Sequence, residues 1–228
     1  GNFELSGDAI EATLKQLGQP LTYRAKFTND QASASSQMPV EVQNMKTAGV
    51  EQVMLGSDFL LAIPFMQQAE QQQYFPPYTS SDLGALASNG LIRKGPTRSL
   101  DNTIGVTTQF TISPEGRTEQ ADSKDCREYY NKSNPGSKQF AFGEAGPFNI
   151  ICSEVELLGR AGQPAGKVLT RAGLVAAVLH LGAGSLPTSL PGSFAPGKSD
   201  FSDNVWAARY HTDCQCYKVA GPVTRARY

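Results

Sequence analysis

The sequence feature that most constrains the fold of this chain is an apolar segment, residues 50–55, that stops abruptly at Gly56-Ser57-Asp58. A segment that is apolar at most positions is typical of a parallel strand covered on both faces. The residues that follow, 59–72, have the pattern of a helix, with Pro64 in its first turn or at a kink. A strand joined to a helix by a short turn is the repeating unit of an α/β fold.

The first half of the chain repeats this alternation with short connections. We expect helices at residues 8–17 (with Ser6 as N-cap), 40–48 and 59–72, strands at 21–27, 50–55, 76–80 and 103–110, a polar loop at 29–36, and a loop with a short helix at 80–88. Alternating helices and strands predict a doubly wound parallel sheet. Ligands of such sheets bind beyond the carboxyl ends of the strands.

The second half changes character after a polar linker at residues 111–120. We expect helices at residues 123–131, 147–161 and 171–181 (with Thr170 as N-cap), a loop at 186–203 rich in Pro, Gly and Ser, and two antiparallel strands at 205–210 and 214–219. The apolar stripe of the middle helix consists of Phe148, Ile151, Cys152, Val155 and Leu158.

Composition excludes several classes of function. The 228 residues carry 20 basic and 21 acidic side chains, a formal net charge of −1, which gives no reason to expect a nucleic-acid partner. With two histidines and Cys214-Gln215-Cys216 too closely spaced for a zinc knuckle, we expect no metal. No glycine-rich phosphate loop and no nucleophile motif is present, so we expect no cofactor and no catalytic residue. The four cysteines allow three disulfide connectivities, or free thiols.

Two interpretations of the Gly56-Ser57-Asp58 turn stay open from the residues alone. Ser57 or Asp58 can cap the following helix by accepting from its first free N–H groups. The same helix start, with a carboxylate at the end of a strand, can also hold a polar ligand.

Several longer segments, in their order, resemble the branched-chain amino-acid group of type I periplasmic solute-binding proteins. They are GNFELSGDAIEATLKQLG, FTNDQASASSQMPVEVQNMKTAGVEQVMLGSDFLLAIPFMQQAEQQQYFPPYTSSD, CREYYNKSNP, FNIICSEVELLGRAGQPAGKVLTRAGLVAAVLHLG and FAPGKSDFSDNVWAARYHTDCQCYKV. The resemblance implies a doubly wound parallel lobe with part of a second lobe. Residues 1–110 would form ligand-binding lobe 2, residues 111–190 a helical part of lobe 1, and residues 191–228 a hairpin returning to lobe 2. The family's N-terminal segment has no counterpart, so we expect an N-terminally incomplete protein.

The resemblance also implies positions for the ligand and the disulfides. The family's carboxylate that meets the ligand ammonium aligns with Leu61, and Asp58 is the nearest substitute. The full set of expected ligand-binding residues is Asn2, Phe3, Ser57, Asp58, Phe59, Tyr78 and Asp82. Cys126 and Cys152 fall on helices that would pack in the same lobe, so this pair is the expected disulfide. Cys214 and Cys216 would be joined locally or free.

The function implied by the resemblance is binding. The protein would be a monomer that captures an amino acid or a similar small polar ligand between two lobes. It would deliver this ligand to the membrane permease of an ABC importer. Such a protein is extracytoplasmic, either periplasmic or a cell-surface lipoprotein. A ligand-sensing ectodomain without transport is the first alternative, and an α/β enzyme that uses Asp58 as acid or base is the second.

Overall fold

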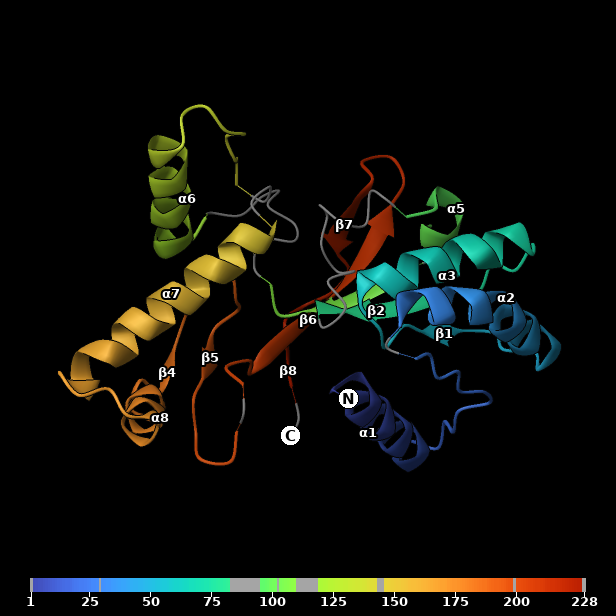
Figure 1. Ribbon diagram of the computed structural model, residues 1–228, viewed down its shortest axis with the longest axis horizontal. Helices are drawn as coiled ribbons and strands as arrows, with labels where there is room; N and C mark the ends of the chain where they lie inside the picture. The colour runs from blue at the N-terminus through green and yellow to red at the C-terminus, as the bar shows by residue number, and fades with distance from the viewer. Residues whose placement is uncertain are drawn as a thin grey trace. The chain divides into compact units, whose positions relative to one another are not determined.

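A computed structural model of the chain describes residues 2–28, 30–82, 95–101, 103–109, 119–142, 146–198 and 200–226 (Figure 1). The chain divides into two compact units. Unit 1 comprises residues 1–106 and 208–218, and unit 2 comprises residues 107–207 and 219–228. The chain therefore passes from one unit to the other at three places.

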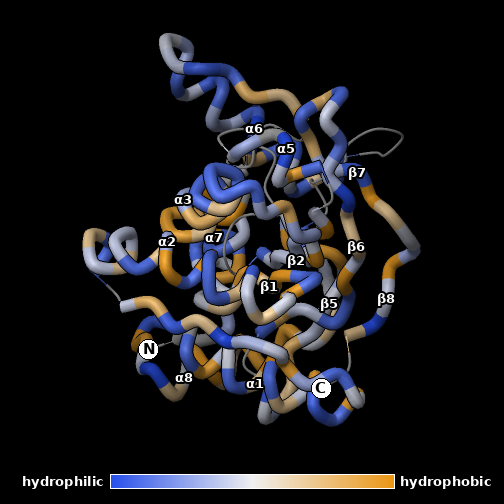
Figure 2. Tube along the Cα trace, turned by 90° about the vertical axis from the view of Figure 1, so that its right-hand side faces the viewer, coloured by the Kyte–Doolittle hydropathy of each residue, from blue (hydrophilic) through white to orange (hydrophobic). Residues whose placement is uncertain are grey.

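Unit 1 contains four of the described helices. They are α1 (Asn2–Gln16), α2 (Gln31–Thr47), α3 (Phe59–Gln71) and α5 (Thr97–Leu100). Helices α2 and α3 lie side by side in both views (Figures 1 and 2). Their contact buries one apolar stripe from each helix, Ala34, Met38, Val42 and Met45 from α2 and Ala62, Ile63, Phe65, Met66 and Ala69 from α3. These spacings place each set on a single helical face, which explains why the two helices pack together.

The sheet of unit 1 is mostly parallel. Its strands are β1 (Val53–Met54), β2 (Tyr78–Ser81), β3 (Ile104–Thr107), β6 (Asn204–His211) and β7 (Cys216–Val219), in the spatial order β1-β2-β3-β6-β7. Strands β1, β2 and β3 run parallel, with Val53 opposite Tyr78 and Thr79 opposite Ile104. Strand β6 reaches this sheet with its second half, where Tyr210 donates from its backbone N–H to the Thr103 carbonyl oxygen at 3.0 Å. The expected α/β fold with a parallel sheet is confirmed.

Unit 2 is built around the long helix α7. Its described elements are α6 (Ala121–Ser133), α7 (Gly146–Ala165), α8 (Arg171–His180), β4 (Ala183–Gly184), β5 (Gly192–Ser193) and β8 (Thr224–Arg225), with the first half of β6. Helices α6 and α8 both contact α7. Strands β4 and β5 form an antiparallel pair, and β8 pairs antiparallel with β6. Thr170 caps α8 as expected, because its hydroxyl accepts from the Gly173 N–H at 3.0 Å.

All four cysteines form disulfides. Cys126 of α6 is joined to Cys152 of α7, with Cα atoms 6.3 Å apart, which confirms the pairing that the family resemblance implied. Cys214 is joined to Cys216 across a single residue, with Cα atoms 5.2 Å apart. The local bond was one of the two outcomes left open for this pair.

Several predicted element boundaries were wrong. Residues 31–36 belong to α2 rather than to a loop, because Asp30 caps the helix by accepting from the Ser33 N–H at 2.8 Å. Their polar side chains lie on the exposed face of a helix whose other face buries Ala34. Helix α1 begins at Asn2, so Ser6 is not its N-cap.

Residues 21–27, expected to form a strand, belong to no strand of the structure. Their side chains bind residues of α1 and α2. The Arg24 guanidinium contacts the carboxylates of Asp8 and Glu11, each at 2.7 Å. The alternation along these residues was therefore not sufficient to form a strand with a ladder of backbone hydrogen bonds.

The apolar stripe of α7 is also not the buried face that the sequence led us to expect. Ile151, Val155 and Leu158 have side chains that are 55%, 64% and 56% exposed, whereas Cys152 and Ala161 are buried. Within the described residues, α7 uses its other face to contact α6 and α8. The stripe predicted the helix correctly, but it did not predict which face of the helix is buried. The side chain of Phe148, the remaining member of the stripe, lies outside the described residues.

Candidate ligand-binding site

The candidate site lies in unit 1, where β1 and β2 end. Strand β1 stays paired to β2 one residue past Met54, because the Leu55 N–H donates to the Thr79 carbonyl oxygen at 2.8 Å. The chain then turns at Gly56 and starts α3 at Phe59. The predicted helix at residues 59–72 is confirmed to within one residue, and it contains Pro64 in its second turn.

Asp58 is the N-cap of α3. Its backbone is extended, with φ −71° and ψ 170°, and its Oδ1 accepts from the Leu61 N–H at 3.2 Å. Ser57 donates from its hydroxyl to the Asp58 carbonyl oxygen at 3.4 Å. The capping interpretation of the turn is therefore confirmed. It leaves the ligand-binding interpretation open, because the cap uses Oδ1 alone.

The end of β2 lies beside this turn. Strands β1 and β2 run parallel, with Met54 opposite Thr79, so the residues that follow β1 and the residues at the end of β2 lie at the same edge of the sheet. The side chains of Ser57, Asp58, Ser81 and Asp82 are all half-buried. The structure therefore brings two hydroxyls and two carboxylates to one edge of the sheet, at the carboxyl ends of adjacent parallel strands.

Tyr78, an expected ligand-binding residue, is the first residue of β2, whereas Ser81 is the last. Its side chain is fully buried, and Ser80 on the same face of β2 is 3% exposed. Burial raises the pKa of the Tyr78 hydroxyl above its ordinary value, against a smaller opposing effect of the Ser99 hydroxyl. Tyr78 thus supports the site as part of the core of unit 1.

Tyr217 of β7 belongs to the same buried layer. Burial raises the pKa of its hydroxyl to about 12, and Ser80 lowers it by a smaller amount. Both tyrosines are therefore neutral at any physiological pH. The charges at this edge of the sheet come from the carboxylates.

Three other expected residues have mixed outcomes. Phe59 is half-buried at the first position of α3, next to Asp58. The backbone of Asn2 and Phe3 forms the start of α1, not a loop, and the side chains of both lie outside the described residues. A contact of these two side chains with a ligand stays a prediction.

The structure also contains a pocket that the sequence did not indicate. It lies in unit 2, is open to solvent and has a volume of about 540 Å³. Its lining residues are Ala183, Gly184, Ser185, Pro191, Gly192, Asp203 and Asn204. The Pro-Gly-Ser composition of residues 186–203 predicted a loop and gave no signal that part of it, β5, would pair with β4.

Neither unit offers a metal centre in its described part. In the described ranges, no three His, Cys, Asp or Glu side chains gather closely enough to hold a metal ion. None of the helices in the described ranges combines the length and apolarity that a membrane span needs.

Solved structures that resemble this chain identify its fold. No protein-family model and no curated protein sequence matches the sequence. A branched-chain amino acid ABC transporter protein from Thermus thermophilus with bound valine matches with a TM-score of 0.65 and 10% identity, over 93% of this chain and 55% of that chain. A type 1 periplasmic binding protein from Bordetella pertussis Tohama I matches with a TM-score of 0.60 and 15% identity, over 93% and 56%.

The chain has the type I periplasmic-binding fold. A fatty acid ABC transporter substrate-binding protein from Thermomonospora curvata shares this type I fold, with a TM-score of 0.60 and 16% identity over 83% of this chain and 47% of that chain. The chain spans about half the length of the solved structures that it matches. One of these neighbours serves a fatty acid transporter and another binds valine, so the type I fold is compatible with more than one class of ligand.

Proposed function

We propose that this chain is part of an extracytoplasmic solute-binding protein that captures a small zwitterionic ligand, an amino acid or a close analogue, for an ABC importer. The observation that carries the proposal is the polar edge formed by Ser57, Asp58, Ser81 and Asp82 on a type I fold. Similarity to ABC transporter binding proteins supports the transport role, at the level of the fold.

The charges at the edge favour a ligand with both an ammonium and a carboxylate group. Asp58 and Asp82 supply negative charge for an ammonium, and hydrogen bonds to a charged partner contribute about 1.5–3 kcal/mol each. The first turn of α3 presents the positive end of its helix dipole at the same place, which favours an anionic group. An α-amino acid carries both groups on one carbon atom.

The ligand screen uses the chain itself and one matched pair of variants. Ligand-observed NMR with amino acids, amides and small carboxylates measures binding down to millimolar affinity. Asp58→Asn removes the charge but keeps a good N-cap, because Asn and Asp cap helices about equally well. Asp30→Asn makes the same change at the N-cap of α2, which lies outside the proposed site.

We expect at least one amino acid to bind, and Asp58→Asn to weaken its affinity about 10-fold or more, while Asp30→Asn leaves the affinity unchanged. Absence of binding by every compound in the panel would contradict the proposal. Equal effects of the two variants would reduce Asp58 to a helix cap. Chemical turnover of the bound ligand would favour an α/β enzyme instead.

A further inference from the structure

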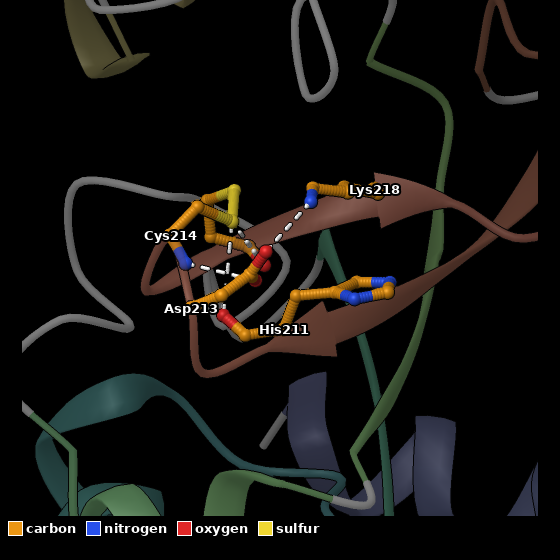
Figure 3. Close-up of a disulfide and its surroundings, with 5 residues drawn as sticks. His211, Asp213, Cys214 and Lys218 are labelled. Carbon is orange, nitrogen blue, oxygen red and sulfur yellow. Dashed lines mark hydrogen bonds and ion pairs between the residues drawn. A yellow bond between two sulfur atoms is a disulfide. The ribbon is translucent and has the colours of Figure 1, made fainter.

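The turn between β6 and β7 carries a disulfide with unusual local geometry (Figure 3). Cys214 and Cys216 are separated only by Gln215, whose φ is +49°. Residues other than glycine rarely adopt this left-handed region of φ, and a residue held there stores backbone strain. Opening the disulfide removes the ring of three residues that fixes this conformation.

The hairpin has several contacts that do not involve this disulfide. The backbone N–H of Tyr210 donates a hydrogen bond to the Thr103 carbonyl oxygen at 3.0 Å. The ring of Tyr210 packs edge-on against the ring of Tyr217, with centroids 5.8 Å apart. Lys218 bridges the turn to the Asp213 carboxylate at 3.3 Å. These contacts involve neither sulfur, so they persist when the disulfide opens.

The surroundings of Cys214 also suit a reduced thiol. Its Sγ lies 3.7 Å from the carbonyl oxygens of both His211 and Cys216. A disulfide sulfur has no proton to donate, whereas a thiol can donate to either oxygen. The reduced form therefore gains interactions that the oxidised form lacks, which favours reduction. In Figure 3 the ring of His211 extends away from the sulfurs, so only its carbonyl takes part.

Access and charge distinguish the two sulfurs. Cys214 is half-buried in a turn whose residues Thr212, Asp213 and Gln215 are exposed, whereas Cys216 is 6% exposed. Cys216 and Lys218 are two residues apart on β7, so their side chains share one face of the strand. The Lys218 ammonium favours a thiolate on that face.

We propose that the Cys214–Cys216 disulfide is a thiol–disulfide exchange site, which an external dithiol reduces by attack at Sγ of Cys214. The dithiol thiolate forms a mixed disulfide with Cys214, and Cys216 leaves as a thiolate that takes a proton from water. The second thiol of the partner, as a thiolate, then attacks the partner sulfur of the mixed disulfide. Cys214 leaves and is protonated in turn. Two electrons and two protons pass to the chain, and the partner becomes a disulfide.

The second disulfide of the chain is a built-in control. Cys126–Cys152 closes a sequence separation of 26 residues and joins two helices, whereas Cys214–Cys216 closes a separation of 2. The packing of α6 against α7 keeps Cys126 and Cys152 together after reduction and so favours re-formation of their bond. Opening Cys214–Cys216 instead releases the backbone strain at Gln215, so this disulfide should be the easier one to reduce.

The test equilibrates the full chain with graded ratios of reduced to oxidised dithiothreitol, traps free thiols by alkylation, and identifies the labelled peptides by mass spectrometry. We expect Cys214 and Cys216 to be half-reduced at a ratio about 10-fold lower than Cys126 and Cys152, because opening releases backbone strain at Gln215. Far-UV circular dichroism and the fluorescence of Trp206 should stay native through this first transition. Cys126→Ser/Cys152→Ser should keep the first transition, and Cys214→Ser/Cys216→Ser should lose it.

Trapping the mixed disulfide identifies which of the two sulfurs is attacked. A thioredoxin-like dithiol protein whose second active-site cysteine is replaced by serine stops at the mixed disulfide, which we expect on Cys214. Trapping on Cys216 would overturn the assignment of the attacked atom. Reduction of Cys126–Cys152 first, or loss of native circular dichroism together with reduction of Cys214–Cys216, would overturn the proposal and leave this disulfide as a structural staple.

Discussion

Gly192 and Gly184 allow a sharp test of packing in unit 2. They are paired opposite each other in the β4–β5 ladder, and neither has a positive φ. A Cβ atom added to Gly192 would overlap the Phe201 carbonyl oxygen and would lie 3.0 Å from both the carbonyl carbon and Cδ1 of Phe201. A Cβ atom at Gly184 would meet nothing within 4 Å. The same substitution therefore has opposite consequences at two adjacent positions.

The magnitude follows from three contributions. The Phe201 carbonyl oxygen accepts from the Ser193 N–H at 3.0 Å, so displacing it stretches a hydrogen bond that contributes about 1 kcal/mol. Overpacking a filled site adds about 1–3 kcal/mol. Replacing glycine also makes the unfolded chain less flexible, which offsets about 0.4–1 kcal/mol. Gly192→Ala should therefore lower the free energy of unfolding by about 2–3 kcal/mol, and Gly184→Ala should leave it unchanged or raise it by about 0.5 kcal/mol.

Equilibrium unfolding in urea measures both values, with fluorescence as the probe. Trp206 is the single tryptophan of the chain, belongs to unit 2 and is 5% exposed. Its indole N–H donates to the Gln109 carbonyl oxygen at 3.1 Å, so its emission reports on the packing of this unit. Equal effects of the two substitutions, or a neutral Gly192→Ala, would show that Phe201 does not occupy the space above Gly192.

Two further predictions concern charge and the disulfides. Hydrogen bonding from Ser193, followed by Lys198, lowers the pKa of Asp203, so its stabilising effect is present above the unfolded pKa and is lost as the pH falls through the folded pKa. Unfolding followed from pH 6 to pH 2 should show a shallower acid loss of stability for Asp203→Asn, and an unchanged slope would contradict this. Replacing Cys126 and Cys152 by Ala should cost about 3.5 kcal/mol, against about 1.5 kcal/mol for Cys214 and Cys216, because the sequence separations are 26 and 2. Each pair has one member that is 6% exposed, so cavity effects are matched, and equal losses in urea unfolding would refute the loop-entropy explanation.

Sequence reasoning predicted the candidate site in part. The turn after β1, the start of α3 at Phe59 and its cap by Ser57 or Asp58 follow from local rules, because caps and turns depend on neighbouring residues. Tyr78 was expected at the ligand because the sequence predicted that residues 78–82 lie at the carboxyl end of the third strand. Its complete burial is a tertiary property: β2 lies between β1 and β3, and Ser99 of α5, 21 residues further along the chain, lies at the Tyr78 hydroxyl. Alternation along a strand shows that two faces differ but does not show which face other elements cover.

The sequence by itself determined the alternation of helices and strands, the parallel sheet, a cap of α3 by Ser57 or Asp58, the cap of α8 by Thr170, and the even number of cysteines. All of these depend on local propensity, on periodicity or on composition. Only the tertiary structure decided which apolar stripes are covered. The stripe of α2 meets α3 and is buried, whereas Ile151, Val155 and Leu158 of α7 stay exposed among the described residues. It also decided that Gly192 lies against Phe201 and that Cys214 pairs with Cys216. The physical reason is that hydrophobicity measures how much a surface gains from burial, but burial requires a partner surface that the rest of the chain must supply.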